Sequence, residues 1–149
     1  MARVKINLPE KFLFSCTIPI RITDINYGGH VGNDSLLSII HEARLQFLKS
    51  LEYTEMQFAG AGLIMADAAI EFKKELFYGD TIIVSIGVGE ISKVGIVLFY
   101  KLEKESLLKD GKDKIVVAIA KTGMVCYDYE KKKIVAVPEE VKNKLVIDK

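Results

Sequence analysis

The sequence predicts an α+β protein in which an antiparallel β-sheet wraps around one buried helix. A single long segment, residues 34–51, has the apolar period of a helix, whereas one run before it and four runs after it have the composition of strands. This order of one strand, one long helix and four consecutive strands is typical of α+β proteins. The chain has 149 residues, of which 50% are hydrophobic, so we expect one globular domain spanning residues 1–149.

The first strand is expected at residues 12–22, FLFSCTIPIRI, because aromatic and β-branched side chains are frequent in this run. Pro19 has no N–H to donate to a strand ladder, so it indicates an edge strand or a bulge. The next stretch, DINYGGHVGND at residues 24–34, is crowded with Gly, Asn and Asp. These residue types are typical of turns, so we expect the chain to turn sharply before the helix begins.

The helix is expected at residues 34–51, with Asn33 or Asp34 as its N-cap. Its apolar arc consists of residues that recur at helical spacing: Leu36, Leu37, Ile40, Ala43, Phe47 and Leu48. Arg44 falls within this arc, so its guanidinium requires a carboxylate or carbonyl partner. Glu42 falls on the opposite, polar face.

Four more strands are expected after a Gly-containing loop at residues 59–62. They span residues 63–77, 80–91, 94–104 and 114–129. Between the last two, a polar segment is expected to form a hairpin connection with its turn at Asp110-Gly111, and residues 138–145 are expected to form a terminal turn or short helix. Because one helix covers only part of such a sheet, we expect apolar surface to remain and the chain to form a homo-oligomer.

The composition excludes several function classes. Lys and Arg number 21 and Asp and Glu number 20, and a net charge of +1 offers no electrostatic basis for binding nucleic acid or a membrane surface. No run approaches the roughly 18 apolar residues of a membrane span, and the N-terminus lacks the apolar core of a signal peptide, so we expect a cytoplasmic protein. Cys16 and Cys126 lie in separate strand-like runs outside any metal-ligand spacing, so we expect free thiols, no metal and no resident cofactor.

The turn at residues 24–34 combines the features of a candidate binding site. A helix N-terminus presents unpaired N–H groups and the positive end of the helix dipole, which suit an anion or a developing oxyanion. Gly28 and Gly29 permit a sharp turn and a close approach of a ligand to the backbone. His30 and Asn26 are able to polarise a carbonyl or orient water. A capped turn without chemistry is the alternative interpretation.

This stretch resembles a known family. R-I-T-D-I-N-Y-G-G-H-V-G-N-D, followed by a helix containing H-E-A-R, is similar to the signature of the hot-dog-fold acyl-CoA thioesterases, in particular the 4-hydroxybenzoyl-CoA thioesterase-like group. F-K-K-E-L-F-Y-G-D at residues 72–80 resembles the family's F-x-x-P-x-x-Y-G-D, with Glu75 where Pro is usual. The similarity covers about residues 12–138 and implies a hot-dog fold, a five-stranded sheet around one central helix.

The resemblance leaves the catalytic carboxylate open. The family's usual catalytic Asp corresponds to Asn26, and an amide cannot act as a general base or nucleophile as a carboxylate does. Asp24, Glu42 and Asp67 are the three alternatives. Asp24 would share a face with Asn26 only if the backbone between them is extended. Glu42 would act from the helix. Asp67 would act from its strand, and the alternative to a catalytic role is an ion pair with a residue such as Arg44.

The resemblance also suggests positions that contact substrate. The backbone N–H of Asn33 corresponds to the group that faces the thioester carbonyl in the family, and His30 holds the turn or binds that carbonyl. Tyr27 lines an acyl pocket or packs, and Lys93, in the turn at residues 92–95, contacts the CoA phosphates or is simply solvated. The turn residues Gly29 and Asp34, together with Asp67, complete the expected substrate-binding set.

The implied function is hydrolysis of acyl-CoA thioesters to the free acid and CoA, which enters only as part of the substrate. The site is expected to form between two subunits of a homodimer or homotetramer. Three alternatives remain open: acyl-CoA binding without hydrolysis, hydrolysis of acyl-carrier-protein thioesters, and hydration, although the Asp/His motif of related hydratases is not recognised. The sequence does not indicate the acyl group, its length or the pathway.

Overall fold

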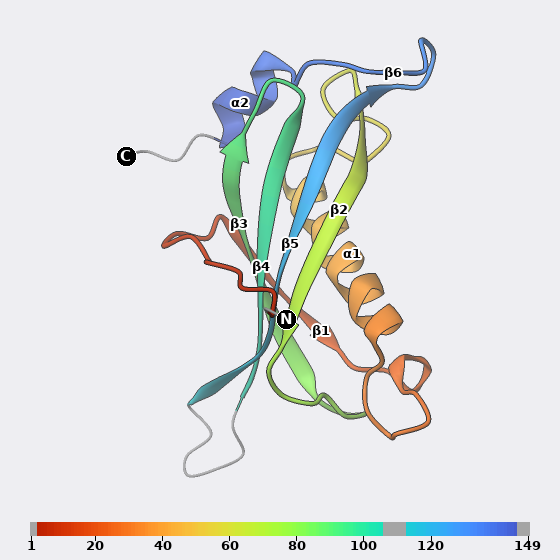
Figure 1. Cartoon of the computed structure of the whole chain (residues 1–149), viewed down its shortest axis with the longest axis vertical. Helices are drawn as coiled ribbons and strands as arrows, with labels where there is room; N and C mark the ends of the chain where they lie inside the picture. Colours follow the sequence, from red (N-terminus) through yellow and green to blue (C-terminus); the bar gives the residue numbers. More distant parts are fainter. Residues whose placement is uncertain (1–2, 106–112, 146–149) are drawn as a thin grey trace.

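In the computed structural model, five strands form an antiparallel sheet in the order β1–β3–β4–β5–β2, with helix α1 across one face (Figure 1). The structure describes residues 3–105 and 113–145. The main elements are β1 (Phe14–Pro19), α1 (Asn33–Ser50), β2 (Gly62–Phe72), β3 (Thr81–Ile91), β4 (Gly95–Glu105) and β5 (Lys114–Asp128). The predicted fold class is thus confirmed.

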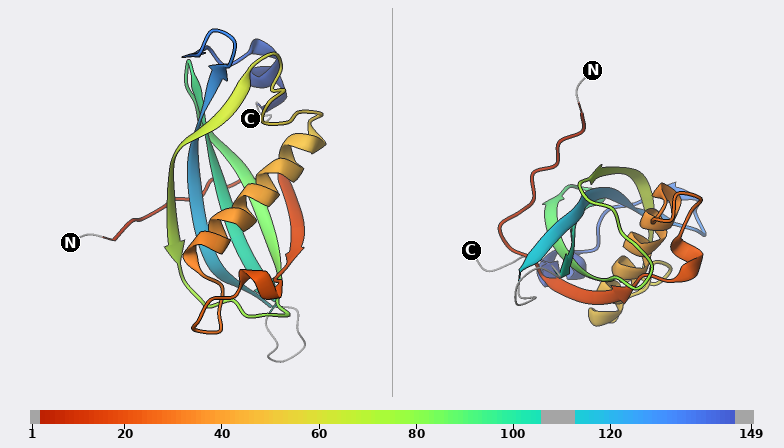
Figure 2. Two further views of the ribbon diagram at one scale, coloured as in Figure 1. Left: turned by 90° about the vertical axis from the view of Figure 1, so that its right-hand side faces the viewer. Right: turned by 90° about the horizontal axis from the view of Figure 1, so that it is seen from below.

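The core lies between the concave face of the sheet and α1, which runs across that face between the two edge strands (Figure 2). Side chains alternate along each strand, so every second residue points toward the helix. On β4 these inward residues are Ile96, Leu98, Tyr100 and Leu102, and all four are buried. The helix buries Leu36, Ile39, Ile40, Ala43, Arg44, Phe47 and Leu48. Its predicted apolar arc is therefore confirmed except at Leu37, which is 39% exposed.

The predicted ends of two strands were wrong. β1 ends at Pro19, and a 3-10 helix, η1 (Ile22–Asp24), follows in place of further strand. β1 is nevertheless an edge strand, as Pro19 predicted. β2 ends at Phe72 and not at residue 77, because the N–H groups of Lys73 and Lys74 both donate to the carbonyl of Val117 and end the regular ladder.

The C-terminal part adds a short strand, β6 (Lys133–Ile134), that the sequence did not predict, and it pairs with β5. The predicted terminal helix is confirmed as α2 (Glu139–Leu145), which buries Val141 and Leu145. The predicted turn at residues 110–111 lies outside the described residues.

The segment before β1 crosses the convex face of the sheet, in front of the strands in Figure 1. The N–H of Leu13 donates to the carbonyl of Ile86, and at the far side the N–H of Ile6 donates to Glu71 at 2.6 Å. Gly87 allows this close crossing, because a Cβ there would lie 2.7 Å from the ring of Pro9. The convex face is thus partly covered by the chain itself.

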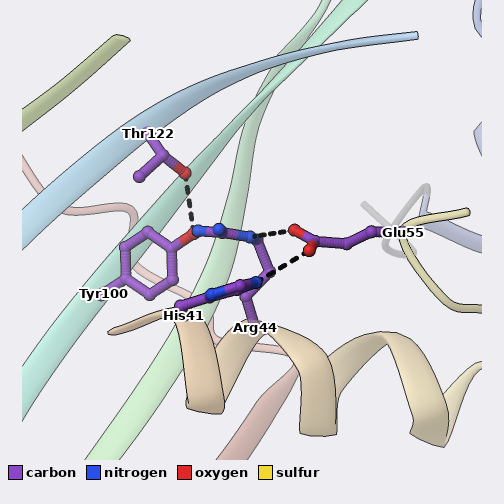
Figure 3. Close-up of polar contacts among 5 residues, drawn as sticks. All are labelled: His41, Arg44, Glu55, Tyr100 and Thr122. Carbon is purple, nitrogen blue, oxygen red and sulfur yellow. Dashed lines mark hydrogen bonds and ion pairs between the residues drawn. The ribbon is translucent and has the colours of Figure 1, made fainter. Parts of the chain in front are cut away.

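A polar network joins α1 to the sheet (Figure 3). Arg44 Nε donates to Glu55 Oε2 at 2.9 Å, and its Nη1 donates to the hydroxyl of Tyr100 at 3.2 Å. Tyr100 in turn lies 2.7 Å from the hydroxyl of Thr122, and His41 Nε2 lies 2.8 Å from Glu55 Oε1. The prediction that Arg44 requires a carboxylate or carbonyl partner is confirmed, and the partner is the carboxylate of Glu55.

Burial and hydrogen bonding shift the pKa values of this network in opposite directions. Burial alone would raise the pKa of Glu55, but the hydrogen bonds from His41 and Arg44 outweigh it and hold that pKa below its ordinary value. Burial raises the pKa of Tyr100, and Arg44 and Thr122 offset only part of this effect. Tyr100 therefore stays protonated and can donate to Thr122 while it accepts from Arg44.

We expect Glu55 to make folding sensitive to acid. Because its pKa is lower in the folded chain than in the unfolded one, its stabilisation is fully present above the ordinary value of 4.5 and is lost as the pH falls below it. Acid unfolding followed by circular dichroism should show a weaker dependence on pH in Glu55→Gln than in the wild type. Glu139→Gln is the control, since that side chain is 80% exposed, and an equal slope in both variants would contradict the prediction.

Candidate active site

The turn that precedes α1 is held by the backbone and side chain of Asp24. This residue is 4% exposed, and its carboxylate accepts the N–H of Arg21 at 2.8 Å and the Arg21 guanidinium at 3.4 Å. Its carbonyl accepts the N–H of Gly32 at 3.4 Å. Because η1 interrupts the extended backbone, Asp24 and Asn26 do not follow a simple strand alternation. Asp24 closes the turn and does not line the cavity described below.

The tip of the turn is built by Asn26 and Gly29. The side-chain oxygen of Asn26 accepts the N–H of Gly28 at 2.9 Å, which is an Asx-turn, and its backbone N–H donates to the carbonyl of His30. Gly29 has φ +79°, a left-handed conformation that a side chain would strain. The sequence prediction of a sharp turn is confirmed here. Tyr27, at the same tip, is fully exposed, so it neither packs nor lines a pocket within this chain.

No side chain caps the N-terminus of α1. The N-cap is Gly32, not Asn33 or Asp34 as predicted, and it has no side chain with which to accept a hydrogen bond. The first N–H of the helix that reaches a backbone acceptor is that of Leu36, which donates to Gly32 at 3.0 Å. The preceding N–H groups of the first turn, those of Asn33, Asp34 and Ser35, have no acceptor among the described residues and remain free for a ligand.

A cavity of about 280 Å³ adjoins this helix end. Its polar lining residues are His30, Asn33, Lys73, Lys74 and Glu75. The remaining wall is mainly apolar and comprises Val31, Leu36, Phe72, Leu76, Val117 and Ala118. A largely apolar cavity with a few converging polar groups is the usual form of a small-molecule site.

The far wall of the cavity is a short segment, residues 73–76, that is tied to the turn. The N–H of Val31 donates to the carbonyl of Leu76 at 2.9 Å, and Val117 holds the other end of the segment. Lys104 Nζ donates to the carbonyl of Glu75 at 3.1 Å. The structure therefore brings residues 73–76 and residues 30–33 to one cavity, although they are far apart in the sequence.

Two of the predicted catalytic carboxylates lie elsewhere. Glu42 is exposed on the side of α1 that faces β1, where it accepts a hydrogen bond from Gln46 at 2.8 Å and lines a separate groove with Arg21. Asp67 lies midway along β2 and accepts the N–H of Gly123 at 3.0 Å. The expected ion pair of Asp67 with Arg44 was wrong, since Arg44 pairs with Glu55.

Lys93 is also distant from the cavity within one chain. It lies in the β3–β4 turn, where its carbonyl accepts the N–H of Val137 next to α2, at the opposite end of the sheet from the start of α1 (Figure 1). Asp34 is exposed in the first turn of α1. Of the ten predicted site residues, the cavity is lined only by His30 and Asn33.

The sequence reasoning missed the segment Lys73–Lys74–Glu75. Residues 63–77 were predicted to form one strand, and no role in the site was assigned to these charged residues. A signal was present in the sequence, because three consecutive charges cannot alternate between the two faces of a half-buried strand. Within the described residues, no group of three or more His, Cys, Asp or Glu side chains is placed to hold a metal ion, and no helix is long and apolar enough to span a membrane. Cys16 and Cys126 are free, as predicted.

Residues 20–145 match the Thioesterase-like superfamily. A protein from Aquifex aeolicus (strain VF5), named "Putative esterase", is 30% identical over 115 residues, which are 76% of this chain and 82% of that protein. Among solved structures, a 1,4-dihydroxy-2-naphthoyl-CoA thioesterase from Synechocystis is 19% identical with a TM-score of 0.74, covering 89% of this chain and 94% of that one. A variant of 4-hydroxybenzoyl CoA thioesterase in complex with 4-hydroxybenzoyl CoA is 15% identical with a TM-score of 0.78, covering 89% and 98%. These structural likenesses identify the hot-dog fold.

Proposed function

Because the chain belongs to the thioesterase-like superfamily, we propose that it hydrolyses acyl-CoA thioesters to the free acid and CoA. The observation that carries the proposal is the uncapped N-terminus of α1 beside a cavity that Asn33 and His30 line. Free N–H groups and the helix dipole stabilise negative charge, and such charge develops on the carbonyl oxygen when water attacks a thioester.

In this mechanism the thioester carbonyl points at the first turn of α1. The N–H of Asn33 donates to the oxygen, and that hydrogen bond strengthens as the oxygen becomes an oxyanion. His30 orients the carbonyl or the attacking water, since its ring lines the same cavity and its Nδ1 lies 3.2 Å from the carbonyl of Val31. Asn26 supports the turn that carries both groups. The C–S bond then breaks, and CoA leaves as the thiol.

Lys73 and Lys74 complement the other end of the substrate. Both are exposed residues that line the cavity, and the phosphate groups of CoA are anionic. Lys73 has Glu71 as an ion-pair partner at 3.7 Å, whereas the Lys74 ammonium has no partner among the described residues. We therefore assign to these lysines, rather than to the distant Lys93 of the same chain, the contact with CoA.

We also propose that the active form is a homodimer or homotetramer. β2 is an edge strand, and the surface beside it carries exposed apolar side chains, including Met65 at 45%, Leu37 at 39% and Leu45 at 39%. Unpaired strand edges with neighbouring apolar surface favour association with another strand. Pairing of β2 with the same strand of a second chain would continue the sheet across the two chains and cover this apolar surface.

The test is steady-state hydrolysis of a panel of CoA thioesters, from short to long aliphatic acyl groups plus benzoyl and phenylacetyl, with a thiol-trapping dye. We expect turnover on at least one member, and light scattering on the same sample gives the mass of the active species. Cys126 adds little background, because burial raises its pKa to about 11. If the chain binds acyl-CoA but releases CoA from no thioester of the panel, the result would favour the alternative function, a non-catalytic acyl-CoA-binding protein. Asn26 in place of the usual Asp suggests that alternative.

A further inference from the structure

We propose that Glu75 is the general base of the hydrolysis, in place of the carboxylate that the chain lacks at Asn26. This inference rests on the proposed function and names the group that activates water in the same site. Of the described residues that line the cavity beside α1, Glu75 is the only acid. A general base must lie within reach of the water it deprotonates, so position in this cavity is the first criterion.

The other acids near the turn fail that criterion. The Asp24 carboxylate is buried and holds Arg21 through two hydrogen bonds, so it faces the interior of the turn. Glu42 is on another side of the helix, and Asp67 lies midway along β2 with its carboxylate on Gly123. Asp34 belongs to the exposed surface of the first helical turn and does not line the cavity.

The backbone at Glu75 is fixed relative to the oxyanion site. The carbonyl of the next residue, Leu76, accepts the N–H of Val31, and Val31 lies between His30 and the first turn of α1. On the other side, Lys104 Nζ holds the carbonyl of Glu75 itself. Direct hydrogen bonds thus link the residues on either side of the cavity. They hold the base and the oxyanion site at a fixed relative position, as catalysis requires.

The charged residues around Glu75 are mainly cationic. Lys73 and Lys74 flank it along the chain, and Lys104 approaches from β4, although Asp80 neutralises part of that charge at 3.3 Å. His30 lines the same cavity from the turn. The side chain of Glu75 is exposed and has no hydrogen-bond partner among the described residues, so both oxygens are available to water. A carboxylate oxygen that has no other partner can accept a proton from water.

Water and Glu75 supply the protons that the hydrolysis requires. The Glu75 carboxylate takes one proton from water as the water oxygen bonds to the thioester carbon. The tetrahedral oxyanion is held at the N-terminus of α1 and collapses as the C–S bond breaks, and the protonated Glu75 returns its proton to the departing sulfur. The acid and the free thiol of CoA are the products, and Glu75 is restored.

Glu75→Gln tests the assignment, because the amide keeps the shape but cannot accept the proton. We expect kcat to fall by about 10²–10⁴-fold with KM within about threefold of the wild type. Glu75→Asp, which keeps a carboxylate on a shorter side chain, should retain part of the wild-type kcat. Glu90→Gln, an exposed acid on β3, is the matched control and should retain wild-type kinetics.

Two results would overturn the inference and can be told apart. If the wild type hydrolyses a thioester and Glu75→Gln keeps more than about a third of its kcat, the thioesterase function stands and Glu75 is not the base. If the wild type releases no CoA from any thioester of the panel, the proposed function fails and the role of Glu75 fails with it. Circular dichroism of each variant confirms that the fold is retained.

Discussion

Asn33→Pro is expected to lower kcat for acyl-CoA hydrolysis by about 10²–10³-fold, the usual cost of removing one donor from an oxyanion site. The substitution removes the backbone N–H together with the asparagine side chain, and position 33 is the first residue of α1, where proline is well tolerated. Gly32 already has φ −82° and ψ 167°, an extended conformation that suits a residue before proline. The fold should therefore be retained while the donor is lost.

The matched variant is Asn33→Ala, which removes the side chain and keeps the N–H. If the main-chain donor stabilises the oxyanion, this variant should lose less than tenfold in kcat. Steady-state kinetics on the best substrate of the panel compare the two, and thermal unfolding should give melting temperatures within a few degrees of each other. Equal losses in both variants would show that the side chain, and not the backbone N–H, is what matters at this position.

Arg44→Ala is expected to lower the free energy of unfolding by about 3 kcal/mol, near the lower end of the range for breaking a buried ion pair. Arg44 is 5% exposed, and its loss leaves Glu55 and the Tyr100 hydroxyl without their donor and opens a cavity between α1 and the sheet. The side chain of Glu55 is 24% exposed, so water can solvate its carboxylate and reduce the loss of stability. In a domain of this size, the loss corresponds to a decrease in melting temperature of roughly 6–12 °C.

Lys142→Ala supplies the comparison for a surface ion pair. Its partner Glu139 lies 3.6 Å away and is 80% exposed, so the change should cost less than about 1 kcal/mol. Urea unfolding at one fixed protein concentration measures both variants, because association of chains would otherwise shift the apparent stability. A loss of less than 1 kcal/mol in Arg44→Ala would mean that the network fixes the helix position without stabilising the fold.

The sequence by itself determined the elements and the fold class, because these depend on short-range patterns. The helical spacing of Leu36, Ile40, Ala43 and Phe47 identified the buried face of α1, and the need of Arg44 for a carboxylate followed from the cost of burying an unpaired charge. Gly29 and Asn26 marked the sharp turn, and their local chemistry is sufficient to form it. Each of these inferences requires only neighbours within a few residues along the chain.

The composition of the site was decided by the tertiary structure. Asp24, Glu42 and Asp67 are all candidate bases in the sequence, but the 3-10 helix, the face of α1 and the position on β2 direct them to separate places. Glu75 reaches the cavity because Lys73 and Lys74 both bond to Val117, which ends β2 early, and because Val31 then bonds to Leu76. These contacts join residues that are tens of positions apart. No local pattern encodes them, since the pairing of distant segments is set by the packing of the whole sheet around α1.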